Sequence, residues 1–157
     1  MGDIQIITYT ESLASEFERL NRAWIEKFFI VEATDLEIFR NPRESIIDPG
    51  GQIYFAKIDG MIVGTCAAQK LSATGWELAK LGVDDRYQRK GIGQLLCRYV
   101  INYCWDHGAL RIIIETNRAL KPALSLYDKL GFRPFIPEAA SPFVRADMFL
   151  ELRAMQK

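Results

Sequence analysis

Apolar side chains recur along this chain with two periods, and the period separates the expected helices from the expected strands. Between residues 12 and 29 the apolar positions are three or four apart, which indicates a helix with one apolar face. The same spacing returns from Ile92 to about residue 107. Two shorter helices are expected, one around residues 35–39 and one over residues 120–130, where Pro122 is tolerated in the first turn and Gly131 ends the helix.

The strand-like runs are rich in apolar and β-branched residues and are bounded by turn residues. We expect strands over residues 3–9, 52–58, 61–69, 76–83, 110–116, 132–136 and 144–152. Asp59-Gly60 joins the second and third of them and is typical of a β-hairpin. The chain has no linker and no repeat, so we expect a single α/β domain over residues 1–157, with a mixed sheet of about six to seven strands and helices on both faces.

A glycine loop lies between the strand at 76–83 and the helix that starts near Ile92, and it reads Gln88-Arg89-Lys90-Gly91-Ile92-Gly93. Glycines let backbone N–H groups approach a ligand closely, and the start of a helix adds a partial positive charge. Arg89 and Lys90 add two full charges, so the loop is expected to bind a polyanion such as a pyrophosphate. No Ser or Thr follows Lys90 as in a nucleoside-triphosphate loop, and a dinucleotide loop would need glycine at Leu96. The alternative is a tight strand-to-helix turn.

The loop resembles the pyrophosphate-binding signature of the GNAT superfamily, the acetyl-CoA-dependent N-acetyltransferases, whose pattern is Arg/Gln-x-x-Gly-x-Gly/Ala. Val83-Asp84 before the loop and Asn117 after the next strand extend the resemblance, and Leu126-Tyr127-Asp128-Lys129-Leu130-Gly131-Phe132 is similar to the family's Tyr-x-x-x-Gly-Phe signature. It covers about residues 51–135, and residues 145–152 look like the closing strand. The resemblance implies a GNAT-like fold whose sheet is splayed at the cofactor site.

The resemblance also implies the reaction and the residues that bind the cofactor. A primary amine would attack the thioester of bound acetyl-CoA directly, without a covalent enzyme intermediate and without a metal. The implied cofactor-binding residues are Leu81, Gly82, Val83, Gln88, Arg89, Lys90, Gly91, Ile92, Gly93, Gln94, Asn117 and Tyr127. The backbone of residues 81–83 would bind the pantetheine and the thioester oxygen. Asn117 has an equally weighted alternative as a helix cap or turn residue.

Two residues are expected to be catalytic. Tyr127 occupies the family's tyrosine position and would be the general acid for the coenzyme A thiolate; the alternative is a packing aromatic. Glu77 lies eleven residues before Gln88, where some lysine-acetylating members carry a catalytic glutamate, and would act as general base or position a water. The alternative is an ion pair with Lys80 or Arg111. If Glu77 is not the base, Glu115 or ordered water is next in line.

The alternation of side chains along a strand predicts which face of the sheet Glu77 lies on. It places Glu77 with Ala79, Leu81 and Val83, unless a bulge resets the parity.

Composition narrows the function class further. Twenty basic and twenty acidic residues leave no net charge, so neither nucleic acid nor a membrane surface is an expected partner, and acetylation of aminoacyl-tRNA is disfavoured. With one histidine, a metal cluster is not expected, and His107 before Gly108 is interpreted as a helix cap. Cys66, Cys97 and Cys104 are expected in the core of a cytoplasmic protein.

The acceptor stays open at this stage. The expected partner is a small-molecule or peptide amine, and a homodimer is left open. Over residues 22–48 acidic residues outnumber basic ones, which slightly favours a cationic amine. The alternative function is a noncatalytic acyl-CoA-binding regulatory module, against which the presence of both Glu77 and Tyr127 argues.

Overall fold

The computed structural model describes residues 2–155, and in it the strand-like runs pair into one seven-stranded sheet. The strands are β1 (Gln5–Thr8), β2 (Gln52–Ile58), β3 (Met61–Lys70), β4 (Gly75–Val83), β5 (Arg111–Thr116), β6 (Arg133–Pro134) and β7 (Met148–Arg153). Their order across the sheet is β1-β2-β3-β4-β5-β7-β6. Strands β4 and β5 are parallel, and all other neighbours are antiparallel. This mixed sheet confirms the expected fold class.

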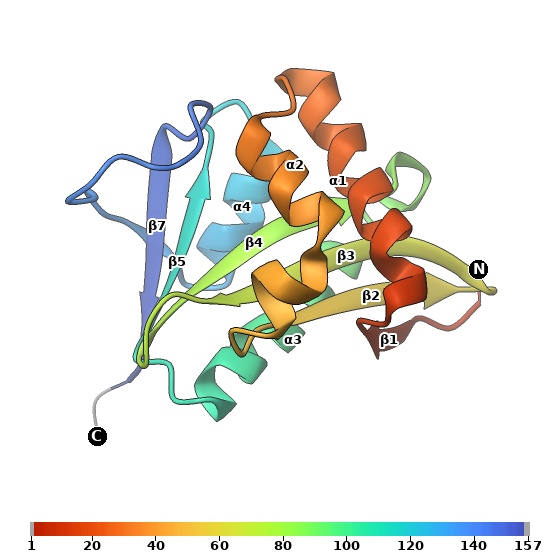
Figure 1. Ribbon diagram of the computed structural model, residues 1–157, viewed down its shortest axis with the longest axis horizontal. Coiled ribbons are helices and arrows are strands. Elements are labelled where there is room, and N and C mark those ends of the chain that lie inside the picture. Colours follow the sequence, from red (N-terminus) through yellow and green to blue (C-terminus); the bar gives the residue numbers. More distant parts are fainter. Residues whose placement is uncertain (1, 156–157) are drawn as a thin grey trace.

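Helices cover both faces of the sheet, as Figure 1 shows, with α1 and α2 over one face and α3 and α4 over the other. The helices are α1 (Ala14–Phe28), α2 (Ala33–Arg40), α3 (Ile92–Asp106) and α4 (Lys121–Lys129), and single turns are found at η1 (Glu11–Leu13), η2 (Arg43–Ile47) and η3 (Asp85–Tyr87). The sequence predicted all four helices to within two or three residues at each end. It did not predict the π-helical turn η2.

Each face has its own apolar core. On the side of α3 and α4, Trp76 and Leu78 of β4 pack with Leu96 and Val100 of α3. On the side of α1 and α2, Phe17, Phe39 and Phe55 are among the buried residues. Burial of a large apolar side chain stabilises the fold by roughly 1.5–3 kcal/mol, so these two layers hold the helices on the sheet.

The expected structural roles of the cysteines and of His107 are confirmed. Cys66, Cys97 and Cys104 are buried and free in the core between β3 and α3. His107 caps the end of α3, and Gly108 has the left-handed conformation, with φ +90°. The His107 ring stacks on Tyr103 with a centroid distance of 3.9 Å.

The last two strands differ from the prediction. The expected strand at 132–136 is reduced to the two residues of β6, and β7 begins at Met148 instead of residue 144. Val144 and Arg145 cannot join the ladder in the usual way, because their backbone N–H groups donate to the Glu32 carboxylate at 2.9 and 3.3 Å. A side chain near α2 therefore decides where β7 starts.

Candidate active site

A cavity of about 770 Å³ lies where β4 and β5 separate. The two strands pair at Gly75↔Arg111, Trp76↔Ile112 and Glu77↔Ile113, and pairing stops there although both strands continue. Figure 1 shows the two strands diverging from this point. The splayed sheet implied by the resemblance is therefore present, and Glu77 is the last residue of β4 that pairs with β5.

The glycine loop and the start of α3 form one wall of this cavity. Gly91 precedes α3 in the left-handed conformation, with φ +80°, and a Cβ at that position would meet no atom within 4 Å. A Cβ on Gly93 would lie 3.4 Å from Leu126 and 3.9 Å from Val83, so this glycine also leaves room. Within residues 2–155, the backbone N–H groups of residues 88–94 donate to no backbone acceptor. Together these features make a cradle of free donors at a helix start, which suits a pyrophosphate.

Most of the expected cofactor-binding residues line the cavity. These are Leu81, Gly82, Val83, Gln88, Arg89, Gly91, Ile92, Gly93, Gln94, Asn117 and Tyr127. Lys90 does not line it and is exposed to solvent. The amide of Gln88 donates to the Val83 carbonyl oxygen at 3.2 Å and to Asp85 at 3.1 Å, which ties the loop to the end of β4.

Asn117 has a structural role. Its amide donates to the carbonyl oxygen of Arg145 at 2.7 Å, and its side-chain oxygen accepts from the N–H of Ala119 at 2.8 Å. It joins the end of β5 to the segment before β7 and supports the turn before α4. This is the turn-residue alternative of the sequence analysis, and the side chain also lines the cavity.

Tyr127 lies on α4 with its side chain buried against the α3-side core. The residue is 5% exposed and its ring packs edge-on against Phe132 at 6.2 Å between centroids. Burial raises the pKa of Tyr127 well above its usual value, and the neighbouring Cys97 and Cys66 act in the same direction. The phenol therefore stays protonated at neutral pH, which is the form that a general acid needs.

Glu77 reaches the cavity without a partner. Its side chain forms no salt bridge or hydrogen bond within residues 2–155, so the structure does not contain the ion pair with Lys80 or Arg111 that was the alternative to a catalytic role. Lys80 is bonded to Asp35, and Arg111 pairs with Glu151 at 2.7 Å. Burial raises the pKa of Glu77 to about 8; the charge of Glu115 adds to this, and Lys80 acts against it.

The expected face of Glu77 needs correction. A bulge interrupts the pairing of β3 and β4 between Ala67↔Ala79 and Thr65↔Gly82, and Lys80 there has φ +57°. Beyond this bulge the parity is reset, because an extra residue is inserted. Lys80 therefore reaches Asp35 on the α2 side, whereas Leu81 and Val83 pack against the opposite core.

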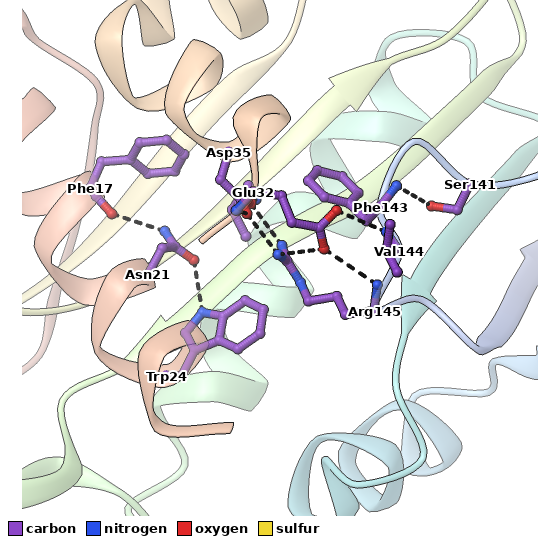
Figure 2. A network of polar contacts seen from close by, with 10 residues as sticks. Phe17, Asn21, Trp24, Glu32, Asp35, Ser141, Phe143, Val144 and Arg145 are labelled. Carbon is purple, nitrogen blue, oxygen red and sulfur yellow. Dashed lines mark hydrogen bonds and ion pairs between the residues drawn. The ribbon is translucent and has the colours of Figure 1, made fainter. Parts of the chain in front are cut away.

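A buried ion cluster closes the α2 side of the cavity (Figure 2). The guanidinium of Arg145 makes two hydrogen bonds of 2.7 Å to Asp35 and one of 3.4 Å to Glu32, and Lys80 donates to Asp35 as well. These cations lower the pKa of Asp35 to about 2 in spite of its burial. Arg145 also lies over the Trp24 and Phe143 rings, at 5.5 and 4.6 Å, which adds cation–π attraction.

Sequence reasoning missed this side of the site. Arg145 lines the cavity from the start of the expected strand at 144–152, and Phe143 lines it from the Pro-rich loop (Pro134, Pro137, Pro142) that was expected before this strand. The prolines indicated the loop but gave no sign that it extends through residues 144–147. The pairing of Arg145 with Asp35 joins residues 110 positions apart and has no local signature.

The described residues also bear on other classes of site. Residues 2–155 hold no group of three or more His, Cys, Asp or Glu side chains that could bind a metal ion. No helix in the same range has the length and apolar character needed to cross a bilayer.

Comparison with known proteins places this geometry in a family. The sequence model of the Acetyltransferase (GNAT) family matches residues 12–132. N-acetylaspartate synthetase of Homo sapiens is 31% identical over 114 residues, which cover 71% of this chain and 36% of that protein. The chain thus spans about a third of the length of this curated relative.

Solved structures show the same fold. A GNAT-family acetyltransferase from Staphylococcus aureus Mu50 superposes with a TM-score of 0.87 at 23% identity, covering 96% of this chain and 99% of that one. N-acetylglutamate synthase from Neisseria gonorrhoeae, solved with coenzyme A and N-acetyl-glutamate, gives 0.77 at 16% identity over 99% of this chain and 36% of that one. With the family match spanning most of its length and this fold around its cavity, the chain belongs to the GNAT family of acetyltransferases.

Proposed function

We propose that this chain is an N-acetyltransferase that moves an acetyl group from acetyl-CoA to a primary amine by direct attack. The observation that carries the proposal is the convergence of three features on one cavity. A cradle of free N–H groups lies at the start of α3, a carboxylate without a partner lies at the fork of β4 and β5, and a protonated phenol comes from α4.

The residues of the chain fit coenzyme A as ligand. Residues 88–94 would hold the pyrophosphate, because their N–H groups have no backbone acceptor and the two glycines leave space for phosphate oxygens. The backbone of residues 81–83 faces the open side of the fork, where β5 no longer pairs with it. An N–H there would hydrogen-bond the thioester oxygen, and such a donor contributes about 3 kcal/mol in other acyl transfers.

When bound, acetyl-CoA supplies a thioester whose C–S bond breaks as the C–N bond of the amide forms. Glu77, directly or through one water, removes a proton from the incoming ammonium, since an alkyl amine is mostly protonated at neutral pH and cannot attack in that form. Tyr127 donates its hydroxyl proton to the departing sulfur. The nitrogen's second proton restores Tyr127, so the products are one amide, one thiol and one proton released through Glu77.

The cysteines are not candidates for a covalent intermediate. Burial raises the pKa values of Cys66 and Cys104, Cys104 to about 12, which keeps both thiols protonated and unreactive at neutral pH. The only histidine, His107, lies at the far end of α3 and does not line the cavity. Direct transfer is therefore the mechanism that the side chains support.

Thiol release from acetyl-CoA in the presence of amines tests the activity, and calorimetry with coenzyme A tests the cradle. We expect Gly93→Glu to abolish coenzyme A binding, because the helical backbone accepts a side chain there and its carboxylate would lie among the phosphates. Gly93→Gln fills the same space without charge and should bind better than Gly93→Glu. Unchanged affinity in a folded Gly93→Glu protein would contradict the proposed cofactor site, whereas binding without turnover of any amine would favour the regulatory module.

A further inference from the structure

On the acceptor side of the cavity, within the residues that the structure describes, the cationic side chains have ion-pair partners and the acidic side chains do not. By the acceptor side we mean the part lined by Trp24, Phe29, Glu77, Lys80, Glu115, Phe143 and Arg145. Both buried cations there are satisfied within the protein, since Lys80 is bonded to Asp35 and Arg145 to Asp35 and Glu32. Because both cations are already ion-paired, neither is available to bind the carboxylate of a ligand.

The two carboxylates on this side are not neutralised in the same way. Glu77 has no partner within residues 2–155. Glu115, on the neighbouring strand, accepts a hydrogen bond from the neutral hydroxyl of Ser141 and forms no ion pair in that range. The charge of Glu115 is near enough to raise the pKa of Glu77. Lys80 also faces Glu77, but its ammonium is held by Asp35. Below about pH 8 Glu77 is largely protonated, so the uncompensated negative charge that this side presents to a ligand is that of Glu115, joined by Glu77 at higher pH.

The same cavity is also lined by aromatic side chains and by the uncharged polar side chains of Thr34 and Gln69. Trp24, Phe28 and Phe29 of α1 and its C-terminal end line the cavity, together with Phe143 from the opposite segment. Lys27, another cation that lines the cavity, has a side chain that is 58% exposed and lies 3.9 Å from Asp85. An acceptor that carries its own carboxylate would thus meet aromatic rings and two acidic groups, which is unfavourable for a desolvated anion.

Resting on the proposed function, we propose that the acceptor is a primary amine that enters as an ammonium ion and bears no carboxylate, and that Glu115 binds this ammonium beside Glu77. An alkylamine, an arylalkylamine or a lysine side chain has this chemistry. Aspartate and glutamate, which occur in the names of the relatives N-acetylaspartate synthetase and N-acetylglutamate synthase, do not.

Pairs of acceptors that differ by a carboxylate measure the effect of that group on turnover. Phenethylamine and L-phenylalanine differ by the α-carboxylate alone, and hexylamine and 6-aminohexanoate differ by a distal one. We expect kcat/KM to be at least about tenfold higher for the carboxylate-free member of each pair, since every 1.4 kcal/mol is a factor of ten. Nα-acetyl-lysine methylamide distinguishes a peptide lysine from a free amine as the source of the same ammonium. Equal or better turnover of L-aspartate, L-glutamate or the carboxylate-bearing members would overturn the inference.

A variant tests the role of Glu115. Glu115→Gln should raise KM for phenethylamine about tenfold and change kcat less than Glu77→Gln does, with coenzyme A affinity unchanged. Glu37→Gln, on the exposed face of α2, is the matched control and should alter neither constant. An unchanged KM in Glu115→Gln removes Glu115 from the acceptor site.

The same experiments separate this inference from the proposed function. If coenzyme A binds and acetyl is transferred, but preferentially to acidic amino acids, the acceptor class alone is wrong. If coenzyme A does not bind and no amine is acetylated, the proposed function is wrong and the acceptor class with it.

Discussion

Glu77 and Lys80 lie three positions apart on β4, and within residues 2–155 only Lys80 has an ion-pair partner. Lys80 is bonded to the buried Asp35, whereas Glu77 faces Glu115 and the cavity. An unpaired carboxylate in largely apolar surroundings disfavours its charged form. Glu77 therefore ionises near pH 8 instead of near pH 4, which is the range where a base for amine acetylation has to work.

Replacing Glu77 by Gln tests this role. The amide keeps the shape of the side chain but cannot take a proton, so turnover should fall by roughly 10²-fold or more. In the unmodified protein the rate should rise with pH through about 8, because the basic form of Glu77 exists only above its pKa. Steady-state thiol release between pH 6 and 9.5 measures both effects. Should Glu77→Gln retain the rate and its rise with pH, the base lies elsewhere.

Tyr127→Phe removes the hydroxyl and keeps the ring. Turnover should fall by about 10²-fold, because the departing thiolate loses its proton donor. Stability should change little, since the buried ring keeps its packing against Phe132. Urea unfolding and single-turnover kinetics measure the two effects, and Tyr99→Phe on the exposed side of α3 is the matched control. A Phe variant with the original single-turnover rate would make Tyr127 a packing residue.

At the scale of elements, α1 packs closely on β4 beside the fork between β4 and β5. A Cβ on Gly82 would lie 2.9 Å from the Leu20 carbonyl oxygen and 3.3 Å from the Trp24 ring. The backbone of α1 thus lies directly over β4 at this glycine, just beyond the bulge at Lys80. The position of Trp24 beside the acceptor side follows from this close approach.

Gly82→Ala should therefore destabilise the protein by roughly 1–3 kcal/mol, because a helix backbone has to move away from the strand. Urea-induced unfolding gives the change in free energy. Gly93→Ala is the comparison, since its Cβ would meet Leu126 at an ordinary 3.4 Å and its stability should be equal or higher. Equal stability of Gly82→Ala and the unmodified protein would mean that α1 has more freedom on β4 than its packing indicates.

Elements whose pattern is local could be predicted from the sequence, and elements decided by distant contacts could not. The period of apolar residues located α1 and α3, and Asp59-Gly60 located the β2–β3 hairpin. The start of β7 depends instead on N–H groups of Val144 and Arg145 that donate to Glu32, more than 110 positions earlier. The bulge that decides the faces of β4 has its left-handed conformation at Lys80 and not at the nearby Gly82, so the sequence does not locate it.

At the scale of the whole molecule, the two sides of the site were unequally predictable. The coenzyme side is a continuous strand–loop–helix, so its residues are neighbours in sequence and carry a recognisable pattern. The acceptor side gathers Lys80, Glu115 and Arg145, and Asp35 behind them, from four separate segments of the chain. These positions have no regular spacing in the sequence. Only the assembled fold shows that the charge of Asp35 is balanced by Lys80 and Arg145, whereas Glu77 has no cationic partner among the described residues.

The ion cluster also ties α2, β4 and the segment before β7 together, and Asp35 is its centre. Asp35→Asn should lower the free energy of unfolding by about 3 kcal/mol at pH 7, because two buried cations lose their shared anion. The folded-state pKa of Asp35, about 2, is below its unfolded value of 3.8, so its contribution is present above pH 3.8 and is lost as the pH falls through 2. Urea unfolding from pH 7 down to pH 2 should therefore show the unmodified protein and Asp35→Asn converging in stability, while Glu37→Gln follows the unmodified protein throughout. A difference that stays constant down to pH 2 would mean that the cluster stabilises the fold through packing and not through the charge of Asp35.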